Sequence, residues 1–268
     1  MNSNERKMVD ILKDLKENYG LLGVKTEFEA EGATMDELCR LKDVTSKADV
    51  GITLKIGGGE GATGIKMGKR LGVSRVVAPM IESAFALKKF VQCARKYYTD
   101  DELLDVELSI NIETITGYNN FDDMLQLPEF TSLGSIVCAR GDMSGSLGKT
   151  FEFMESDELR DMSDKLFKKI KAKFPKTECV VGGVPSPKSF KFLSGIDPAV
   201  LDAFESRKVI FKAPAAYDNK AVEGFVKGLT FEVMWCENKM EFYNALARED
   251  EGKLKSLKAD FEYASSLL

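Results

Sequence analysis

The chain has 268 residues, of which 44% are hydrophobic and 30% charged, and its formal net charge is −5. This balance is typical of a globular protein with a sizeable core, and the absence of a dense basic stripe argues against nucleic acid as a partner. The sequence contains no histidine, which excludes catalysis through an imidazole base and zinc sites built from histidine. Any chemistry must then use carboxylates, lysine, tyrosine, cysteine, backbone amides or a hard metal held by oxygen ligands.

Hydrophobic periodicity along the chain predicts an alternation of helices and strands. Helices are predicted at residues 4–18, 34–47, 62–71, 83–98, 117–130, 155–174 and 188–193, and from about 219 almost to the C-terminus. Strands are predicted at residues 24–31, 51–56, 73–82, 108–114, 135–142, 178–184 and 207–212. Because short links join about seven strand–helix repeats, the pattern favours a parallel sheet of βα units.

A (β/α)8 barrel fits this length and the lack of any linker-like break, so we expect an α/β fold of the TIM-barrel type, with one domain over residues 1–268. A doubly wound open sheet is the alternative. Only seven strands are clear, and the eighth is expected either in the N-terminal segment or within residues 195–206. Residues 219–268 are expected to form a helical extension that could serve in oligomer contacts.

Two further features of the sequence bear on where the protein works. No apolar run approaches the roughly 20 residues needed to span a bilayer, so no membrane association is expected. The first residues carry no apolar signal-peptide core, and the five scattered cysteines lack zinc or redox spacing. We therefore expect reduced thiols in a cytoplasmic protein.

Two predicted strands end in a carboxylate, and they are the strongest candidates for a functional site. In residues 108–114 apolar residues alternate with polar ones up to Glu113, so one face of the strand is apolar and the other polar. Residues 135–142 end in the same way at Asp142. We interpret Glu113 and Asp142 as a pair that holds one divalent metal ion. The alternative is that they are structural acids at strand ends.

Residues 59–64 read Gly-Glu-Gly-Ala-Thr-Gly and match the G-x-G-x-x-G pattern between a strand and a helix. With Glu82 at the end of the next predicted strand, this is the context of a dinucleotide-binding site, so an NAD(P)-dependent oxidoreductase is an alternative function. Glu60 would place a carboxylate near the pyrophosphate, and Pro79 interrupts the strand that should carry the ribose-binding acid. The other interpretation is a tight βα loop, or one that binds an anion on its amides.

Lys55 lies in the predicted strand 51–56, where apolar residues alternate with others. In a barrel this alternation turns Lys55 inward at the C-terminal mouth, where barrel enzymes have their active sites. Lys55 could hold a substrate carboxylate or phosphate there, or it could be a solvated lysine at a strand end.

The region around Glu113 and Asp142 resembles the citrate lyase beta-subunit and class II 2-oxo acid aldolase family. That family has a strand ending in (I/V)-E-T and a later strand ending in G-x-x-D-L-S-x-S-L-G, which here correspond to residues 112–114 and 139–148. Weaker matches to the family lie at residues 27–30, 54–56 and 76–82.

The resemblance implies a (β/α)8 barrel with Mg²⁺ or Mn²⁺ on Glu113 and Asp142, which would bind a 2-oxo acid through its carboxylate and keto oxygens. It implies a carbon–carbon lyase or aldolase that acts on a pyruvate- or oxaloacetate-type substrate, with an aldehyde or acyl-CoA as a possible co-substrate. A divalent cation suits this chemistry because it stabilises the enolate that develops when a bond beside a carbonyl breaks. Backbone amides at Gly141, Asp142 and Met143 could hold the substrate carboxylate, as the resemblance suggests.

Two positions depart from the family pattern. Ala30 stands where the aldolases have a histidine that serves in proton transfer, and Lys55 stands where the family has an arginine that binds carboxylate. We take Glu29 as the candidate for proton transfer and Lys55 as a catalytic and substrate-binding candidate. Glu29 could equally be a solvent-facing acid at a strand end.

Two more residues are candidate ligands for the anionic substrate. Spacing of two along a strand would place Arg140 on the same face as Asp142, although it could merely pair with a neighbouring acid. Glu82, at the end of its predicted strand, is the other candidate.

Several functions remain open from the sequence alone. An acyl-CoA lyase or a thioester hydrolase of the same family would keep the metal site, whereas a non-catalytic 2-oxo acid-binding protein would have lost its base. Members of the family exchange C-terminal helices between subunits, so the resemblance also implies a homo-oligomer.

Overall fold

Eight strands form a closed β-barrel in the computed structural model, which describes residues 1–184 and 186–268. Going around the barrel, the strands follow one another in chain order. Their bounds are β1 Leu21–Glu27, β2 Gly51–Lys55, β3 Arg75–Ala78, β4 Glu107–Ile112, β5 Leu133–Ala139, β6 Glu178–Gly182, β7 Ala203–Glu205 and β8 Val209–Lys212. The predicted TIM-type barrel is confirmed, and β7 is the strand that was expected in the N-terminal segment or within residues 195–206.

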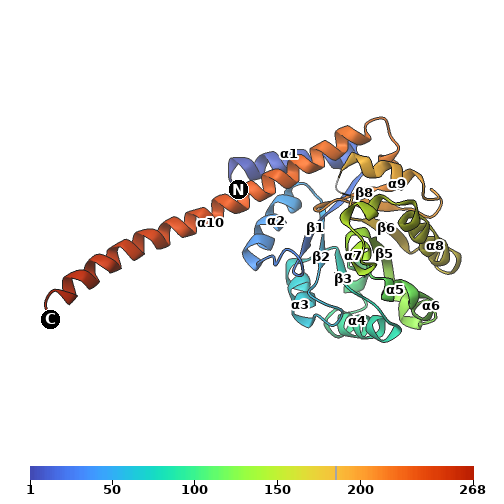
Figure 1. Cartoon of the computed structure of the whole chain (residues 1–268), viewed down its shortest axis with the longest axis horizontal. Helices are drawn as coiled ribbons and strands as arrows, with labels where there is room; N and C mark the ends of the chain where they lie inside the picture. Colours follow the sequence, from blue (N-terminus) through green and yellow to red (C-terminus); the bar gives the residue numbers. More distant parts are fainter. Residues whose placement is uncertain (185) are drawn as a thin grey trace.

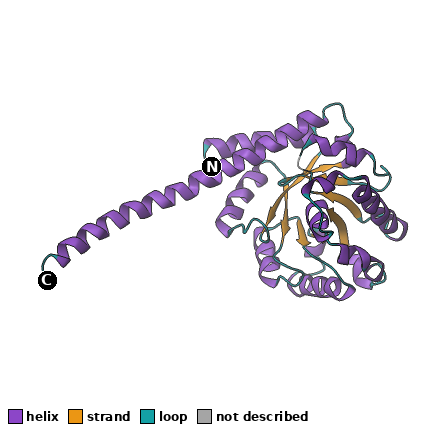
Figure 2. Cartoon of the chain, in the orientation of Figure 1, coloured by secondary structure: helices purple, strands orange, loops and turns teal. Residues whose placement is uncertain are grey.

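Helices surround the barrel on its outer side (Figure 1, Figure 2). Their bounds are α1 Ser3–Asn18, α2 Met35–Lys47, α3 Ala62–Leu71, α4 Ala84–Tyr97, α5 Ile115–Asn119, α6 Phe121–Met124, α7 Arg140–Ser146, α8 Asp157–Lys173, α9 Phe190–Ser194 and α10 Ala221–Ser265. Outward-facing strand residues such as Ile52, Leu54 and Ile110 pack against these helices in one large core, which is why apolar residues alternate along the strands. None of the helices in the described residues combines the length and the apolar character that crossing a membrane requires.

The last strand departs from the expected series of parallel βα units. Each pair of neighbours from β1 to β7 is parallel, whereas β8 is antiparallel to both β7 and β1. Only residues 206–208 connect β7 to β8, and so short a connection can join antiparallel strands but cannot cross over to a parallel one. The chain therefore runs back from the mouth, and β8 ends beside the start of β1.

Inward-facing side chains fill the barrel in layers, as in other barrels of eight strands. At the N-terminal ends of the strands, Arg75 pairs with Glu107 at 2.8 Å and with Glu178 at 2.7 Å. The middle of the barrel is an apolar cluster of Val137, Val180, Ala203 and Ile210. Charged side chains follow at the C-terminal ends of the strands, which form the mouth.

Several predicted strands end earlier than expected, and two of these differences move a predicted site residue off its strand. β5 ends at Ala139 and α7 begins at once, so Asp142 lies in the first turn of a helix rather than at the end of a strand. β3 ends at Ala78, which leaves Glu82 in the loop before α4. The prediction of strand ends at Asp142 and Glu82 is wrong because residue alternation does not mark where an extended segment gives way to a turn or helix.

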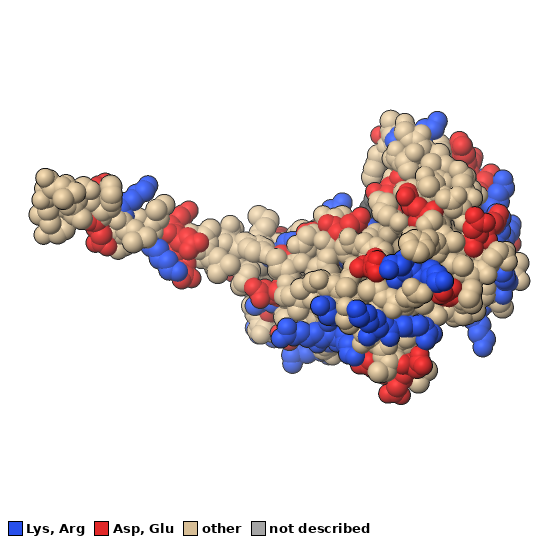
Figure 3. All heavy atoms as spheres, turned by 90° about the horizontal axis from the view of Figure 1, so that it is seen from below, with Lys and Arg blue, Asp and Glu red and all other residues tan. Residues whose placement is uncertain are grey.

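The C-terminal helix α10 has 45 residues, and only its first part packs on the barrel. Phe231 and Trp235 are buried in the core, whereas Val233 is exposed, so the apolar residues of this helix divide between two faces. Residues 243–268 are all exposed, and beyond Tyr243 the helix projects away from the barrel until it ends at Ser265 (Figure 1, Figure 3).

Candidate functional site

A cavity of about 240 Å³ opens at the mouth of the barrel, where active sites of this architecture lie. Its charged lining residues are Lys25, Glu27, Lys55, Glu113, Arg140, Asp142, Glu205 and Arg207. Another cavity, of about 210 Å³, lies toward the opposite end of the barrel beside Tyr19, Phe211 and Phe225. We place the candidate site at the mouth because charged groups from several strands converge there.

Glu113 follows directly after β4 and is buried, with 1% of its surface exposed. Its Oε1 accepts a hydrogen bond from the Met80 amide at 2.8 Å, and its Oε2 accepts one from Asn111 Nδ2 at 2.9 Å. Met80 adopts a φ of 52°, a left-handed conformation that is unfavourable for a residue with a side chain. Burial raises the pKa of Glu113; Lys55, Asn111 and the Met80 amide oppose this effect, and the nearby Asp142 carboxylate adds to it.

Asp142 is exposed at the cavity and makes no ion pair with any residue in the described ranges. It is close enough to Glu113 to raise the pKa of that carboxyl. Asn111 Oδ1 is buried and accepts no hydrogen bond from the residues that the structure describes, so it adds a neutral oxygen beside Glu113. Oxygen donors of this kind are those that Mg²⁺ and Mn²⁺ prefer, so the residues present fit such an ion.

The candidate metal site has few protein ligands. Among residues 1–184 and 186–268, no three acidic or cysteine side chains are grouped so that they could hold a metal ion together. A cation on Glu113 and Asp142 would therefore keep positions open for water or for substrate oxygens, as a catalytic metal site requires.

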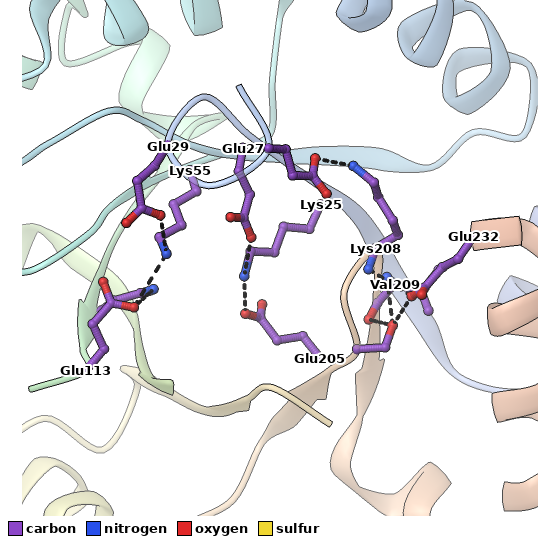
Figure 4. A network of polar contacts seen from close by, with 12 residues as sticks. Lys25, Glu27, Glu29, Lys55, Glu113, Glu205, Lys208, Val209 and Glu232 are labelled. Carbon is purple, nitrogen blue, oxygen red and sulfur yellow. Dashed lines mark hydrogen bonds and ion pairs between the residues drawn. The ribbon is translucent and has the colours of Figure 1, made fainter. Parts of the chain in front are cut away.

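Lys55 ends β2 in the centre of the site and is buried. Its Nζ lies 2.7 Å from Glu29 Oε2 and 3.4 Å from Glu113 Oε2 (Figure 4). The contact with Glu29, which lies in the loop after β1, is an ion pair without hydrogen-bond geometry. Burial would lower the pKa of Lys55, but the Glu113 and Glu29 carboxylates outweigh it and raise the pKa, so the ammonium stays protonated.

A second lysine in the mouth, Lys25 on β1, was missed by the sequence analysis. Its Nζ lies 2.5 Å from Glu205 Oε1 and 3.2 Å from Glu27 Oε1 (Figure 4). Burial would lower the pKa of Lys25, but Glu205 and Glu27 raise it. The spacing of two between Lys25, Glu27 and Glu29 could have placed Lys25 on the inner face. Glu205 gave no such signal, because β7 has only three residues.

The Arg140 side chain is buried and makes its hydrogen bonds inside the protein, although the residue forms part of the cavity wall. Its guanidinium donates to the backbone carbonyls of Met154, Gly182 and Gly183 and to the side chains of Glu155 and Ser189. These contacts use all five N–H donors of the side chain, and burial lowers its pKa. Contrary to the prediction, Arg140 has no donor left for a substrate, because it begins a helix and does not share a strand face with Asp142.

The remaining predicted site residues divide between the cavity and the surrounding structure. Gly141 is exposed and lines the cavity, whereas the Met143 side chain is buried in the core, so only the Met143 backbone could face a ligand. Glu82 does not line the cavity. It accepts a hydrogen bond from Thr114 Oγ1 at 2.6 Å and so helps to fix the loop that leads into α5.

The glycine-rich turn at residues 59–64 has a packing explanation. A Cβ atom on Gly64 would lie 2.9 Å from the Ile56 side chain, so this glycine lets α3 pack closely beside β2. Glu60 pairs with Lys89 at 2.8 Å, away from the mouth cavity. The dinucleotide alternative depended on a topological switch point in an open sheet, and the strands here form a closed barrel.

No protein-family model matches the sequence, and no curated protein matches it. Solved structures do match. A citrate synthase named SbnG is similar over 87% of this chain and 90% of its own, with a TM-score of 0.58 and 14% identity. An HpcH/HpaI aldolase/citrate lyase family protein from Burkholderia cenocepacia J2315 is similar over 83% of this chain and 90% of its own, with a TM-score of 0.55 and 11% identity.

The chain has the fold of the aldolase/citrate lyase family. The Burkholderia cenocepacia neighbour thus comes from the family that the motifs around Glu113 and Asp142 resemble. Within the aldolase/citrate lyase fold, β8 runs antiparallel in this chain and histidine is absent from its site.

Proposed function

We propose that the chain is a carbon–carbon lyase or aldolase that acts on a 2-oxo acid with the help of Mg²⁺ or Mn²⁺. The observation that carries the proposal is the convergence of Glu113 and Asp142 at the mouth. Burial and the second carboxylate raise the pKa of Glu113. A divalent cation between the two carboxylates would stabilise the ionised form of both. The aldolase/citrate lyase fold supports the same class of chemistry.

A cation held by Glu113 and Asp142 would supply positive charge at the keto oxygen, where negative charge develops as the neighbouring bond breaks. The Lys55 ammonium would add a positive charge beside the same group. Glu29, partly exposed in the loop above Lys55, is the candidate proton acceptor. The raised pKa values of Lys55 and Lys25 argue against a Schiff base, because that chemistry needs an unprotonated amine.

Calorimetric titration with oxalate, which mimics a 2-oxo acid enolate, tests the metal pair. We expect the protein to bind oxalate only when Mg²⁺ or Mn²⁺ is present. Glu113→Gln and Asp142→Asn should each weaken this binding by about tenfold or more, because each replaces a negatively charged ligand with a neutral amide. Asp36→Asn is the matched control, since Asp36 is an exposed acid in the first turn of α2. Metal-independent binding, or equal binding by Asp142→Asn, would refute the proposed site.

Exchange of the pyruvate methyl protons with solvent deuterium tests catalysis separately from binding. We expect metal-dependent exchange in the wild type, and Glu29→Gln should slow it by about 10² while leaving oxalate affinity unchanged. Oxalate binding without any exchange would indicate a 2-oxo acid-binding protein. Release of coenzyme A from an acyl-CoA would favour the lyase or hydrolase alternative.

A further inference from the structure

The reversal of β8 places a short turn at the mouth, where a βα loop was expected. This turn, residues 206–208, is held on two sides by its neighbours. Glu232 of α10 accepts hydrogen bonds from Ser206 Oγ at 2.6 Å and from the Lys208 amide at 2.9 Å (Figure 4). The Lys208 carbonyl accepts one from the Lys25 amide at 2.7 Å. The Lys208 ammonium also pairs with Glu31 in the loop after β1, so the backbone of the turn is well fixed.

Arg207 lies at the tip of this turn, is exposed and lines the cavity. In the part of the chain that the structure describes, it makes no ion pair. The other cationic lining residues, Lys25, Lys55 and Arg140, each face at least one carboxylate of the protein. Within residues 1–184 and 186–268, Arg207 is therefore the cavity-lining cation that has no carboxylate as an ion-pair partner.

We propose that Arg207 binds a second anionic group of the substrate, so that the site selects 2-oxo acids that carry a distal carboxylate. This inference rests on the proposed function, because the metal pair positions the 2-oxo acid end of the ligand. The planar guanidinium matches a carboxylate or phosphate with two parallel hydrogen bonds. Because the turn is already fixed to α10 and β1, little backbone order has to be gained when the ligand binds.

Two pairs of ligands with equal chain length test the role of Arg207. In each pair, 2-oxoglutarate with 2-oxopentanoate and 2-oxoadipate with 2-oxohexanoate, only the first ligand has a distal carboxylate. In calorimetric titrations with Mg²⁺, we expect the wild type to bind at least one dicarboxylate about fivefold or more tightly than its partner. Arg207→Gln should abolish this preference without changing the affinity for oxalate, and Arg207→Lys should keep part of it.

Arg70→Gln is the matched control, because Arg70 is an exposed arginine at the end of α3, outside the cavity. The proposal is wrong if Arg207→Gln keeps the preference, or if it weakens both members of a pair equally. It is also wrong if Arg207→Gln tightens Mg²⁺ binding without affecting the preference, because Arg207 would then be a partner of Asp142.

The same titrations separate this inference from the proposed function. Arg207-dependent binding of a dicarboxylate without metal would support the role of Arg207 and contradict the metal site. Metal-dependent oxalate binding without any dicarboxylate preference would support the metal site and contradict the role of Arg207. If the wild type binds none of these acids, both proposals fail.

Discussion

Lys25 keeps a full charge inside the barrel because Glu205 and Glu27 lie within ion-pair distance of its ammonium. Removal of one partner of a buried pair leaves the other charge without compensation, which typically costs about 3–5 kcal/mol. We expect Lys25→Met to lose stability of this size in urea unfolding. The double variant Lys25→Met/Glu205→Gln should recover most of the loss, and a double variant no more stable than Lys25→Met would contradict this account.

The raised pKa of Lys25 also predicts how stability depends on pH. The folded chain holds this proton more tightly than the unfolded chain, whose lysine pKa is 10.5. The stabilising effect is therefore complete below about pH 10.5 and is lost as the pH rises through the folded pKa. Urea unfolding between pH 8 and 11.5 should show a steeper alkaline loss of stability in the wild type than in Lys25→Met.

Arg140 holds the segments around the mouth together, because its guanidinium donates all of its hydrogen bonds to groups of the protein. A lysine has no planar fork and fewer donors, so Arg140→Lys would leave several buried carbonyl and side-chain acceptors unpaired. We expect a loss of about 2–3 kcal/mol in unfolding free energy, with the oxalate affinity of the folded protein unchanged. If Arg140→Lys instead left the melting temperature unchanged and weakened oxalate binding, the result would support the prediction that Arg140 binds the substrate.

At the scale of elements, α10 has a second apolar face that the barrel does not cover. Val226, Val233, Met240, Leu254 and Phe261 fall on a spacing of seven, and each is more than half exposed. Val222 and Leu257 fall on the adjoining row of the same repeat, and both are exposed. This heptad pattern is typical of a helix that pairs with another helix.

We propose that the projecting part of α10 pairs with the same segment of a second copy of the chain, in antiparallel orientation. An antiparallel pair centred between Leu254 and Leu257 brings Glu251 near Lys258 and Lys253 near Asp260 of the other helix, so the flanking charges attract. A parallel pair would instead bring Lys253 of one helix near Lys258 of the other, and these charges repel.

The oligomeric state of designed variants tests this pairing. We expect the wild type to sediment as a dimer or a larger assembly of even number. The double variant Leu254→Glu/Leu257→Glu should dissociate the two copies, because it places four glutamates in one helix–helix interface. Ser256→Glu/Ala259→Glu is the control, since both residues lie on other faces of the same exposed stretch. A monomeric wild type, or variants that associate equally, would refute the pairing.

At the scale of the whole molecule, the barrel could be predicted because most strands alternate inner and outer residues over four positions or more. The position of β7 could not be fixed, because three residues do not establish a period. Glu205, the ion-pair partner of Lys25 on this strand, therefore could not be recognised from the sequence. The motifs located Glu113 and Asp142, and strand alternation correctly turned Lys55 inward. Arg140 was misplaced because its role depends on loops far along the chain, which no local pattern describes.

The antiparallel β8 also bears on how the chain folds. β7 and β8 form a hairpin of neighbouring residues, and such hairpins form in about 1–10 μs. The seam between β8 and β1 instead joins Phe211 to Leu21, which are far apart in the sequence, and contacts of such long range form slowly. We therefore expect the turn that carries Arg207 to form early, and the mouth to be completed only when β8 meets β1.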